Sequence, residues 1–356
     1  MRWLAVVAVL LVCDANPAIA GQAADQHDAG GQADGGPTLH FRGFMDVNFA
    51  ETDAPGSPDG FALGQFVAHF TSSLGHKVNF FGETSFTAHD NTFTTEIERA
   101  ILRYDYNDRF KISAGRYHTP INYWNTAYHH GLWLQTTISR PEMIVGGGTF
   151  QPVHFVGLMA EGSLSSSAAG LGYNVGVGNG RGEFLSRGGD AGDINSDRAW
   201  VGKLFSRPAS LPGLEAGGAV YQDTLNIKAS AGSEVGELIA SGYIALARET
   251  PELIAEFTHV HHHDDLTNLD YNSHAYYVQA ASRLVRWPDW KPYGRVERLT
   301  GEAGDPVFGE LRTTIGTVGV RYELSDLAAL KAEYRHTKRL GVSGVNGVYF
   351  QGAFTF

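Results

Sequence analysis

Apolar and polar residues alternate with a period of two along many short stretches of the chain. In residues 348–356, for example, Phe350, Phe354 and Phe356 fall on one face, and smaller or polar residues fall on the other. Similar alternation runs through 38–49, 76–88, 168–178 and 327–337. A β-strand points successive side chains to opposite faces, so this period predicts strands with one apolar face each.

Turn signals between these stretches divide the chain into roughly sixteen predicted strands. They are residues 38–49, 62–71, 76–88, 93–105, 109–117, 150–161, 168–178, 197–206, 213–222, 236–247, 252–260, 273–285, 291–299, 312–323, 327–337 and 346–356. A soluble β-sandwich would also show alternating strands, so the connections between them must separate the two classes.

Every second connection is short, and the intervening ones are mostly longer. The longer ones are residues 50–61, 118–149, 179–196, 223–235, 261–272 and 300–311. This regular change of length is typical of a membrane barrel with periplasmic turns, periplasmic termini and extracellular loops. The predicted fold class is therefore all-β, a transmembrane antiparallel β-barrel of about 16 strands, within a range of about 14–18.

The N-terminus has the pattern of a bacterial export signal. A short basic start, an apolar stretch over residues 4–12 and the motif Ala18-Ile19-Ala20 predict a signal peptide over residues 1–20. Cys13 raises a lipoprotein alternative, although Val12 is bulkier than the residue that usually precedes a lipidated cysteine. Residues 21–37 carry little to bury and predict a disordered periplasmic lead-in. The barrel is then expected over residues 38–356.

Composition agrees with an exported barrel. The chain has no apolar run long enough for a helical membrane span, and its 44 Gly, 20 Phe and 15 Tyr suit short strands with aromatic girdles. Its formal net charge is −11 without a basic patch, which argues against a nucleic-acid partner. Cleavage after Ala20 removes the single cysteine, so no disulfide is expected.

Two segments resemble known outer-membrane proteins. Residues 96–106, followed by 115–120 with their Gly-Arg and Thr-Pro pairs, are similar to the phosphate-selective porin O/P group of outer-membrane porins. Further similarity lies in 291–293, 319–322 and 332–335. The resemblance implies a barrel whose long third loop folds inward. It does not imply phosphate selectivity, because residues 118–149 contain Arg140 but no lysine cluster.

The C-terminal aromatic also resembles an outer-membrane signature. The chain ends on Phe356, the last apolar position of its final strand. We therefore expect Phe356 to be the contact with the barrel-assembly machinery.

The long connection 118–149 is unusually aromatic for a loop exposed to water. We interpret it as a constriction loop within the barrel, with an alternative in which it only caps neighbouring loops. Its candidate constriction residues are Tyr123, Trp124, His129, His130, Trp133, Arg140 and Glu142.

Charged residues on the polar faces of the strands form a second candidate set. On the predicted register the lumen-facing charges are Arg42, Asp46, Lys77, Glu83, Arg99, Arg103, Arg116, Arg295, Arg321 and Arg335. Such charges bias ion passage in a narrow pore. The alternative is a lattice of ion pairs that only braces the wall.

A histidine-rich run provides weak metal-ligand candidates in His261, His263 and Asp265. Imidazole and carboxylate suit Zn²⁺, Ni²⁺ or Cu²⁺, but neighbouring residues of a strand point to opposite faces. A solvated loop is the preferred interpretation, and no cofactor or metal is predicted.

The function expected from these observations is an outer-membrane porin for passive diffusion of small hydrophilic or ionic solutes. The alternatives are an adhesin or structural barrel, or a barrel enzyme. Expected partners are outer-membrane lipid, small solutes or ions and, by analogy with many porins, two further copies in a homotrimer.

Overall fold

A computed structural model describes residues 37–356, except 58, 90–91, 146–149, 165–167, 182–184, 186–188, 194 and 227–233. The expected signal peptide 1–20 and all of the expected lead-in 21–37 except Pro37 lie outside the described residues.

Sixteen strands and two short helices form in the part of the chain that the structure describes. The strands are β1 Thr38–Thr52, β2 Gly60–Ser73, β3 Val78–His89, β4 Thr92–Asn107, β5 Phe110–His118, β6 His154–Ser163, β7 Leu171–Asn179, β8 Ala199–Ser206, β9 Leu214–Asn226, β10 Glu234–Leu246, β11 Glu252–Asp264, β12 Leu269–Ala281, β13 Trp290–Gly301, β14 Leu311–Ser325, β15 Ala328–Arg339 and β16 Val345–Thr355. The helices are α1 Tyr123–Ala127 and the 3₁₀ turn η1 Glu142–Ile144.

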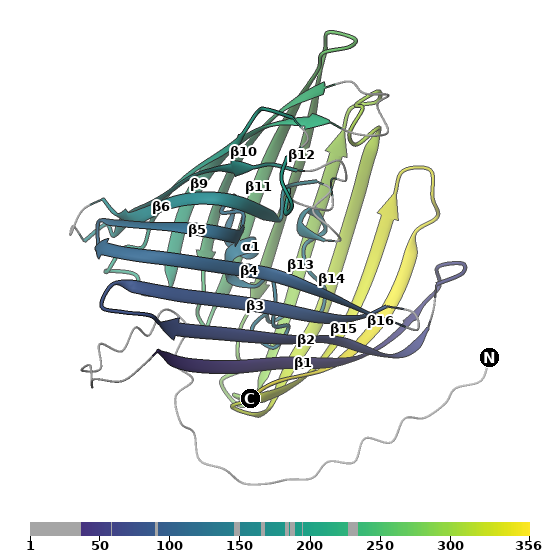
Figure 1. Cartoon of the computed structure of the whole chain (residues 1–356). Coiled ribbons are helices and arrows are strands. Elements are labelled where there is room, and N and C mark those ends of the chain that lie inside the picture. Colours follow the sequence, from purple (N-terminus) through teal and green to yellow (C-terminus); the bar gives the residue numbers. More distant parts are fainter. Residues whose placement is uncertain are drawn as a thin grey trace. The chain divides into compact units, whose positions relative to one another are not determined.

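The strands close into one antiparallel barrel. Each strand pairs with its neighbour in sequence, and β1 pairs with β16 to complete the ring (Figure 1). At this seam Phe44 lies opposite Thr355 and Thr52 lies opposite Gly347. The predicted fold class, a closed antiparallel barrel of about 16 strands, is confirmed.

The two faces of the wall differ as the alternation predicted. On β16 the rings of Phe350 and Phe354 are exposed, whereas Gln351 and Thr355 are almost completely buried. The exposed apolar side chains face away from the barrel interior, as expected for a wall surrounded by lipid. No helix among residues 37–145 or in the later described ranges is long and apolar enough to cross a membrane.

Two features change the local direction of the wall beside β4. The β3–β4 register moves from Glu83 opposite Arg99 to Thr84 opposite Ile97, which leaves Glu98 as the extra residue of a β-bulge. On β5, Gly115 has a φ of +148°, and a Cβ there would lie 1.9 Å from the carbonyl oxygen of Ala100. Only glycine fits this close approach. The bulge residue Glu98 belongs to the interior site described below, and Gly115 lies on the same strand as another of its members, His118.

One predicted connection is wrong. Residues 261–272 were expected to form a long loop, but β11 continues to Asp264 and β12 begins at Leu269. The histidines stay in the strand because they pair with polar residues of β12. His261 lies opposite Asn272, and His263 lies opposite Asp270. Cross-strand polar pairs of this kind stabilise a sheet without an apolar face.

Candidate functional site

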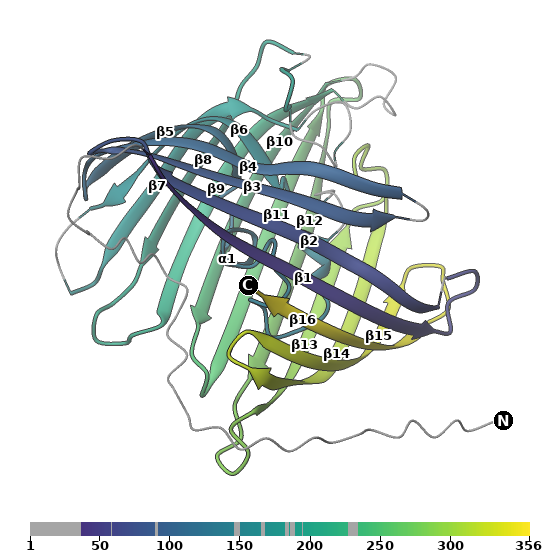
Figure 2. The same ribbon diagram turned by 60° about the horizontal axis from the view of Figure 1, so that its bottom comes forward.

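The connection between β5 and β6, residues 119–153, is called here the inner segment. It enters the ring of strands, and α1 lies inside the barrel in both views (Figures 1 and 2). Asn122 caps α1 by accepting a hydrogen bond from the backbone N–H of Asn125 at 3.2 Å. Trp124 follows this cap and is fully buried. Its ring packs edge-on against Tyr277 of β12, with 6.1 Å between ring centroids.

Inward cations of the wall bind the backbone of the inner segment. Three of them, on β13, β14 and β15, donate to its carbonyl oxygens over distances of 2.5–3.1 Å. They are Arg295 (to Ser139 and Arg140), Arg321 (to Trp133 and Gln135) and Lys331 (to Leu132, Gln135 and Thr137). The carbonyl groups of this non-repetitive backbone therefore find partners although they are away from bulk water.

Inward carboxylates of the wall accept hydrogen bonds from the N–H groups of the same segment. The distances are 2.5–3.3 Å. The pairs are Glu256 with Trp124, Glu297 with Glu142, and Glu333 with Ile138 and Ser139. Charges from β11 to β15 thus hold one backbone in place from both its donor and its acceptor sides.

The expected constriction residues are distributed through this packed segment. Tyr123 is half-buried, 5.8 Å from Tyr128 between ring centroids, and Trp133 lies under the guanidinium of Arg321 at 5.6 Å. Arg140 donates to Gln65 of β2 at 3.1 Å. Glu142 forms an ion pair with Arg339. His129 and His130 are buried and belong to a different group of side chains, described below.

Several of the expected lumen-facing charges form ion pairs or hydrogen bonds. Arg99 pairs with Glu83, and Arg103 pairs with Asp105 at 2.8 Å. Asp46 is buried and accepts from the backbone N–H of Gln65 at 3.0 Å.

Four further expected charges have other surroundings. Arg116 is buried and pairs with Asp190 at 2.7 Å, and Arg335 lies 5.2 Å over the ring of Tyr349. Arg42 is exposed. The strand position expected for Lys77 is wrong, because it lies in the turn before β3 and its ammonium donates to the carbonyl oxygen of Tyr106 at 3.0 Å.

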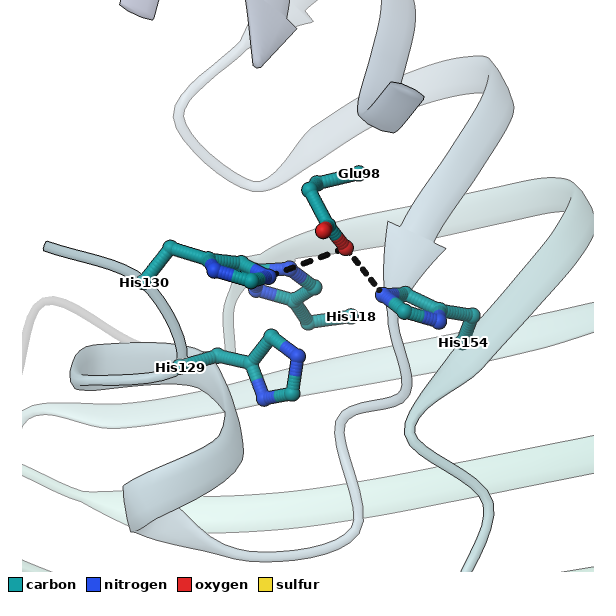
Figure 3. Close-up of side chains that lie close together, drawn as sticks. All are labelled: Glu98, His118, His129, His130 and His154. Atoms are coloured by element: carbon teal, nitrogen blue, oxygen red, sulfur yellow. Dashed lines mark ion pairs between the residues drawn. The ribbon is translucent and has the colours of Figure 1, made fainter. Parts of the chain in front are cut away.

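A compact histidine and glutamate group joins the inner segment to the wall. Its members are Glu98 of β4, His118 at the end of β5, His129 and His130 of the inner segment, and His154 at the start of β6 (Figure 3). All five side chains are buried, and one ligand atom of each lies within 4.8 Å of those of the others. The Nε2 atoms of His130 and His154 are each 2.9 Å from Oε2 of Glu98.

The protonation of the two inner-segment histidines is shifted by their surroundings. Burial lowers the pKa of His129 well below its usual value, and the neighbouring His130 acts in the same direction. Burial also lowers the pKa of His130, although the nearby carboxylate of Glu98 opposes this shift. Both imidazoles are therefore neutral at pH 7 and can offer a lone pair.

Sequence reasoning missed Glu98, His118 and His154 as site residues. Glu98 occupies a bulge position that alternation does not reveal. His154 was placed inside a strand predicted to begin at residue 150, whereas β6 begins at His154 itself, directly opposite His118. Pairing the predicted strand ends, residues 117 and 150, would not have placed His118 opposite His154.

The weak metal candidates of the sequence lie elsewhere. His261 and His263 share one half-exposed face of β11, and His263 Nδ1 lies 2.8 Å from Asp270. Asp265 follows the strand, 3.6 Å from His263. Between them His262 points to the opposite, buried face, where its ring nitrogens contact Glu237 and Asp305.

Solved structures with this fold are outer-membrane proteins. The anion-selective porin from Comamonas acidovorans matches with a TM-score of 0.65 at 13% identity, over 90% of this chain and 100% of that chain. The trimer form of OmpT, an outer membrane protein of Vibrio cholerae, matches with a TM-score of 0.62 at 13% identity, over 90% of this chain and 100% of that chain. The outer membrane channel DcaP of Acinetobacter baumannii matches with a TM-score of 0.61 at 13% identity, over 92% of this chain and 100% of that chain.

No protein-family model and no curated protein matches the chain. At these identities the structural matches show the fold alone, a closed barrel of the kind found in outer-membrane porins. The narrower likeness to the phosphate-selective porin O/P group stays a prediction.

Proposed function

We propose that the protein is an outer-membrane porin, a passive diffusion channel for small hydrophilic or ionic solutes. The observation that carries this proposal is the inner segment, which is held inside a closed barrel by Arg295, Arg321 and Lys331 together with inward carboxylates. A barrel of about sixteen strands is wide enough for an aqueous lumen. A segment fixed across part of that lumen narrows it and sets the size of solutes that pass.

Most inward charges form ion pairs with other side chains or bind the inner segment. This pairing limits how strongly they would select solutes by charge. An arginine whose guanidinium already binds a carboxylate or the inner segment contributes a weaker field than a free one. We therefore propose selection mainly by size, with a modest ionic preference contributed by exposed or half-buried cations such as Arg42 and Arg335.

Conductance in planar lipid bilayers tests the proposed channel directly. Purified, folded protein should produce stepwise currents, and the reversal potential under a salt gradient should give the sign of the preferred ion. The porin proposal is wrong if no current appears at any voltage for protein whose heat-modifiable migration in gel electrophoresis shows that it is folded. An adhesin, structural or enzymatic barrel would then be favoured.

A cysteine label tests whether the inner segment borders the solute path. Thr126 on α1 is exposed although its helix lies inside the barrel. In a Cys13→Ala background, a bulky thiol reagent should reduce the current of Thr126→Cys. Ser210→Cys, in the exposed turn between β8 and β9, is the matched control and should conduct unchanged. Equal behaviour of the two variants would place the solute path elsewhere.

We also propose that the porin is a homotrimer embedded in outer-membrane lipid, as the trimer form of the Vibrio cholerae protein suggests. Its insertion is proposed to use the barrel-assembly machinery through Phe356, which lies at the seam between β1 and β16.

A further inference from the structure

We propose that Glu98, His118, His129, His130 and His154 bind one divalent transition-metal ion, with Zn²⁺ as the first candidate and Ni²⁺ or Cu²⁺ as alternatives. This site is independent of whether the barrel conducts.

The spacing of the five side chains fits a single coordination sphere. Their ligand atoms all lie within 4.8 Å of one another. Donor atoms about 2.1 Å from a metal are separated by roughly 3.4 Å in a tetrahedron and by at most about 4.2 Å across an octahedron. Small side-chain rotations therefore suffice to bring at least four of these donors around one ion.

The contacts within the group are short but are not satisfied as hydrogen bonds. Both Nε2 atoms next to Glu98 Oε2 are 2.9 Å from it, the distance of an ion pair, yet among the described residues no hydrogen bond of standard geometry joins them. A buried polar atom without a hydrogen-bond partner destabilises the folded protein unless another partner, such as a metal ion, binds it. Ligand atoms that lie this close together without well-formed hydrogen bonds are arranged as they would be around a shared metal ion.

The remaining two histidines show the same deficit. Within the described part of the chain, both ring nitrogens of His118 and Nδ1 of His129 are buried without a hydrogen-bond partner. Their ring centroids lie 4.4 Å apart, with an angle of 60° between the ring planes. These ring nitrogens are therefore not hydrogen-bonded to other described groups and can be directed toward a shared ion.

Neighbouring groups orient the proposed ligands. Ser85 donates to Oε1 of Glu98 at 2.5 Å, which leaves Oε2 directed toward the histidines. Nδ1 of His130 lies 3.4 Å from the amide oxygen of Gln65, which leaves its Nε2 for the metal. Outer contacts of this kind fix the tautomer and rotation of metal ligands.

The donor set and local charge indicate the class of ion. Four imidazoles and one carboxylate suit Zn²⁺, Ni²⁺ or Cu²⁺, whereas Ca²⁺ and Mg²⁺ prefer oxygen donors. Arg140 is nearby and would repel a cation, since its guanidinium donates to the same Gln65 at 3.1 Å. The negative charges of Glu98 and Glu83 would offset that repulsion. Glu98 is itself a proposed ligand, and Oε2 of Glu83 lies 3.8 Å from Nε2 of His118.

The ligands come from two parts of the molecule, so metal binding would have a mechanical effect. Glu98, His118 and His154 belong to the wall, and the adjacent pair His129 and His130 belongs to the inner segment. The ion would connect the inner segment to β4, β5 and β6, opposite the ionic contacts from β13 to β15.

Metal binding to the folded barrel tests the inference. Mature protein is stripped with a chelator, dialysed and titrated with Zn²⁺ in competition with a chromophoric chelator, and the bound metal is counted by mass spectrometry. We expect one ion per chain. The double variant His129→Gln/His154→Gln should weaken binding by roughly tenfold or more. The control His261→Gln/His263→Gln, on the other face of the wall, should bind like the wild type.

Cobalt absorption provides a measurement that does not depend on how the variants fold. Wild-type protein loaded with Co²⁺ should show the intense visible bands of a four- or five-coordinate ion with nitrogen donors. The inference is overturned if stripped wild-type protein takes up neither Zn²⁺ nor Co²⁺ at micromolar concentration. It is also overturned if a folded His129→Gln/His154→Gln variant binds as tightly as the wild type.

Discussion

Phe356 completes the barrel through both its backbone and its ring. Its carbonyl oxygen accepts from the backbone N–H of Gly43 at 2.8 Å, and its own N–H donates back to the Gly43 carbonyl oxygen at 3.0 Å. The ring covers Gly43 so closely that a Cβ on Gly43 would lie 2.4 Å from Cζ of Phe356. The terminal aromatic and this glycine therefore form one structural unit at the seam.

Enlarging Gly43 should weaken the closure of the barrel. Gly43→Val would displace the Phe356 ring, at a cost of about 1–3 kcal/mol for overpacking. We expect a smaller folded, heat-modifiable fraction in outer membranes. Gly316→Val on β14 is the control, since a Cβ at Gly316 meets nothing within 4 Å. Equal folded fractions for the two variants would show that the contact between Phe356 and Gly43 does not matter for assembly.

At the scale of elements, the inner segment depends on contacts from strands distant in sequence. Lys331 of β15 alone donates to three carbonyl oxygens of the segment. Each hydrogen bond from a charged donor contributes about 1.5–3 kcal/mol to the free energy of unfolding. The inner segment is therefore docked by the wall rather than by regular structure of its own, which is limited to α1 and η1 among its described residues.

Removing one tether should loosen the inner segment without opening the barrel. Lys331→Met keeps the apolar stem of the side chain and removes its ammonium. We expect faster proteolysis within residues 119–153 and more current noise in single-channel records. Lys338→Met, at an exposed position of the same strand, should behave like the wild type. If both variants resist protease equally, the other tethers suffice and Lys331 is redundant.

The strands were predictable because one physical requirement applies to each of them. A wall with an apolar outer face and a polar inner face imposes a period of two, as on β16. That signal disappears where both faces are polar, which explains the error at His261 and His263. Their strand is held by partners on β12, and such pairing cannot be recognised from one segment alone.

At the scale of the whole molecule, the candidate metal site could not be predicted from the sequence. His129 and His130 are adjacent, but Glu98, His118 and His154 join them only through the β4 bulge, the pairing of β5 with β6 and the inward path of the inner segment. Each of these is a tertiary event. Sequence spacing therefore indicated the half-exposed His261 and His263 instead of the buried group.

The outer surface of the barrel also has an uneven distribution of aromatic side chains. Phenylalanines of β1, β2, β3 and β16, together with Phe356, form two sets of ring contacts, with centroids 5.0–6.3 Å apart. They are Phe41, Phe49, Phe61, Phe66, Phe70, Phe86, Phe350, Phe354 and Phe356. This aromatic face is large and rigid enough to pack against a second copy within the membrane.

Oligomer formation should therefore be sensitive to the aromatic face and insensitive to other parts of the wall. Phe61 is 84% exposed and Leu204 of β8, six strands away in the ring order, is 62% exposed. Loss of an aromatic interface anchor costs about 2 kcal/mol, so Phe61→Asn should shift a trimer toward monomer, whereas Leu204→Asn should not. Cross-linking in native membranes, followed by electrophoresis, measures the ratio. A monomeric wild type would contradict the homotrimer, and equal loss in both variants would place the contact outside this face.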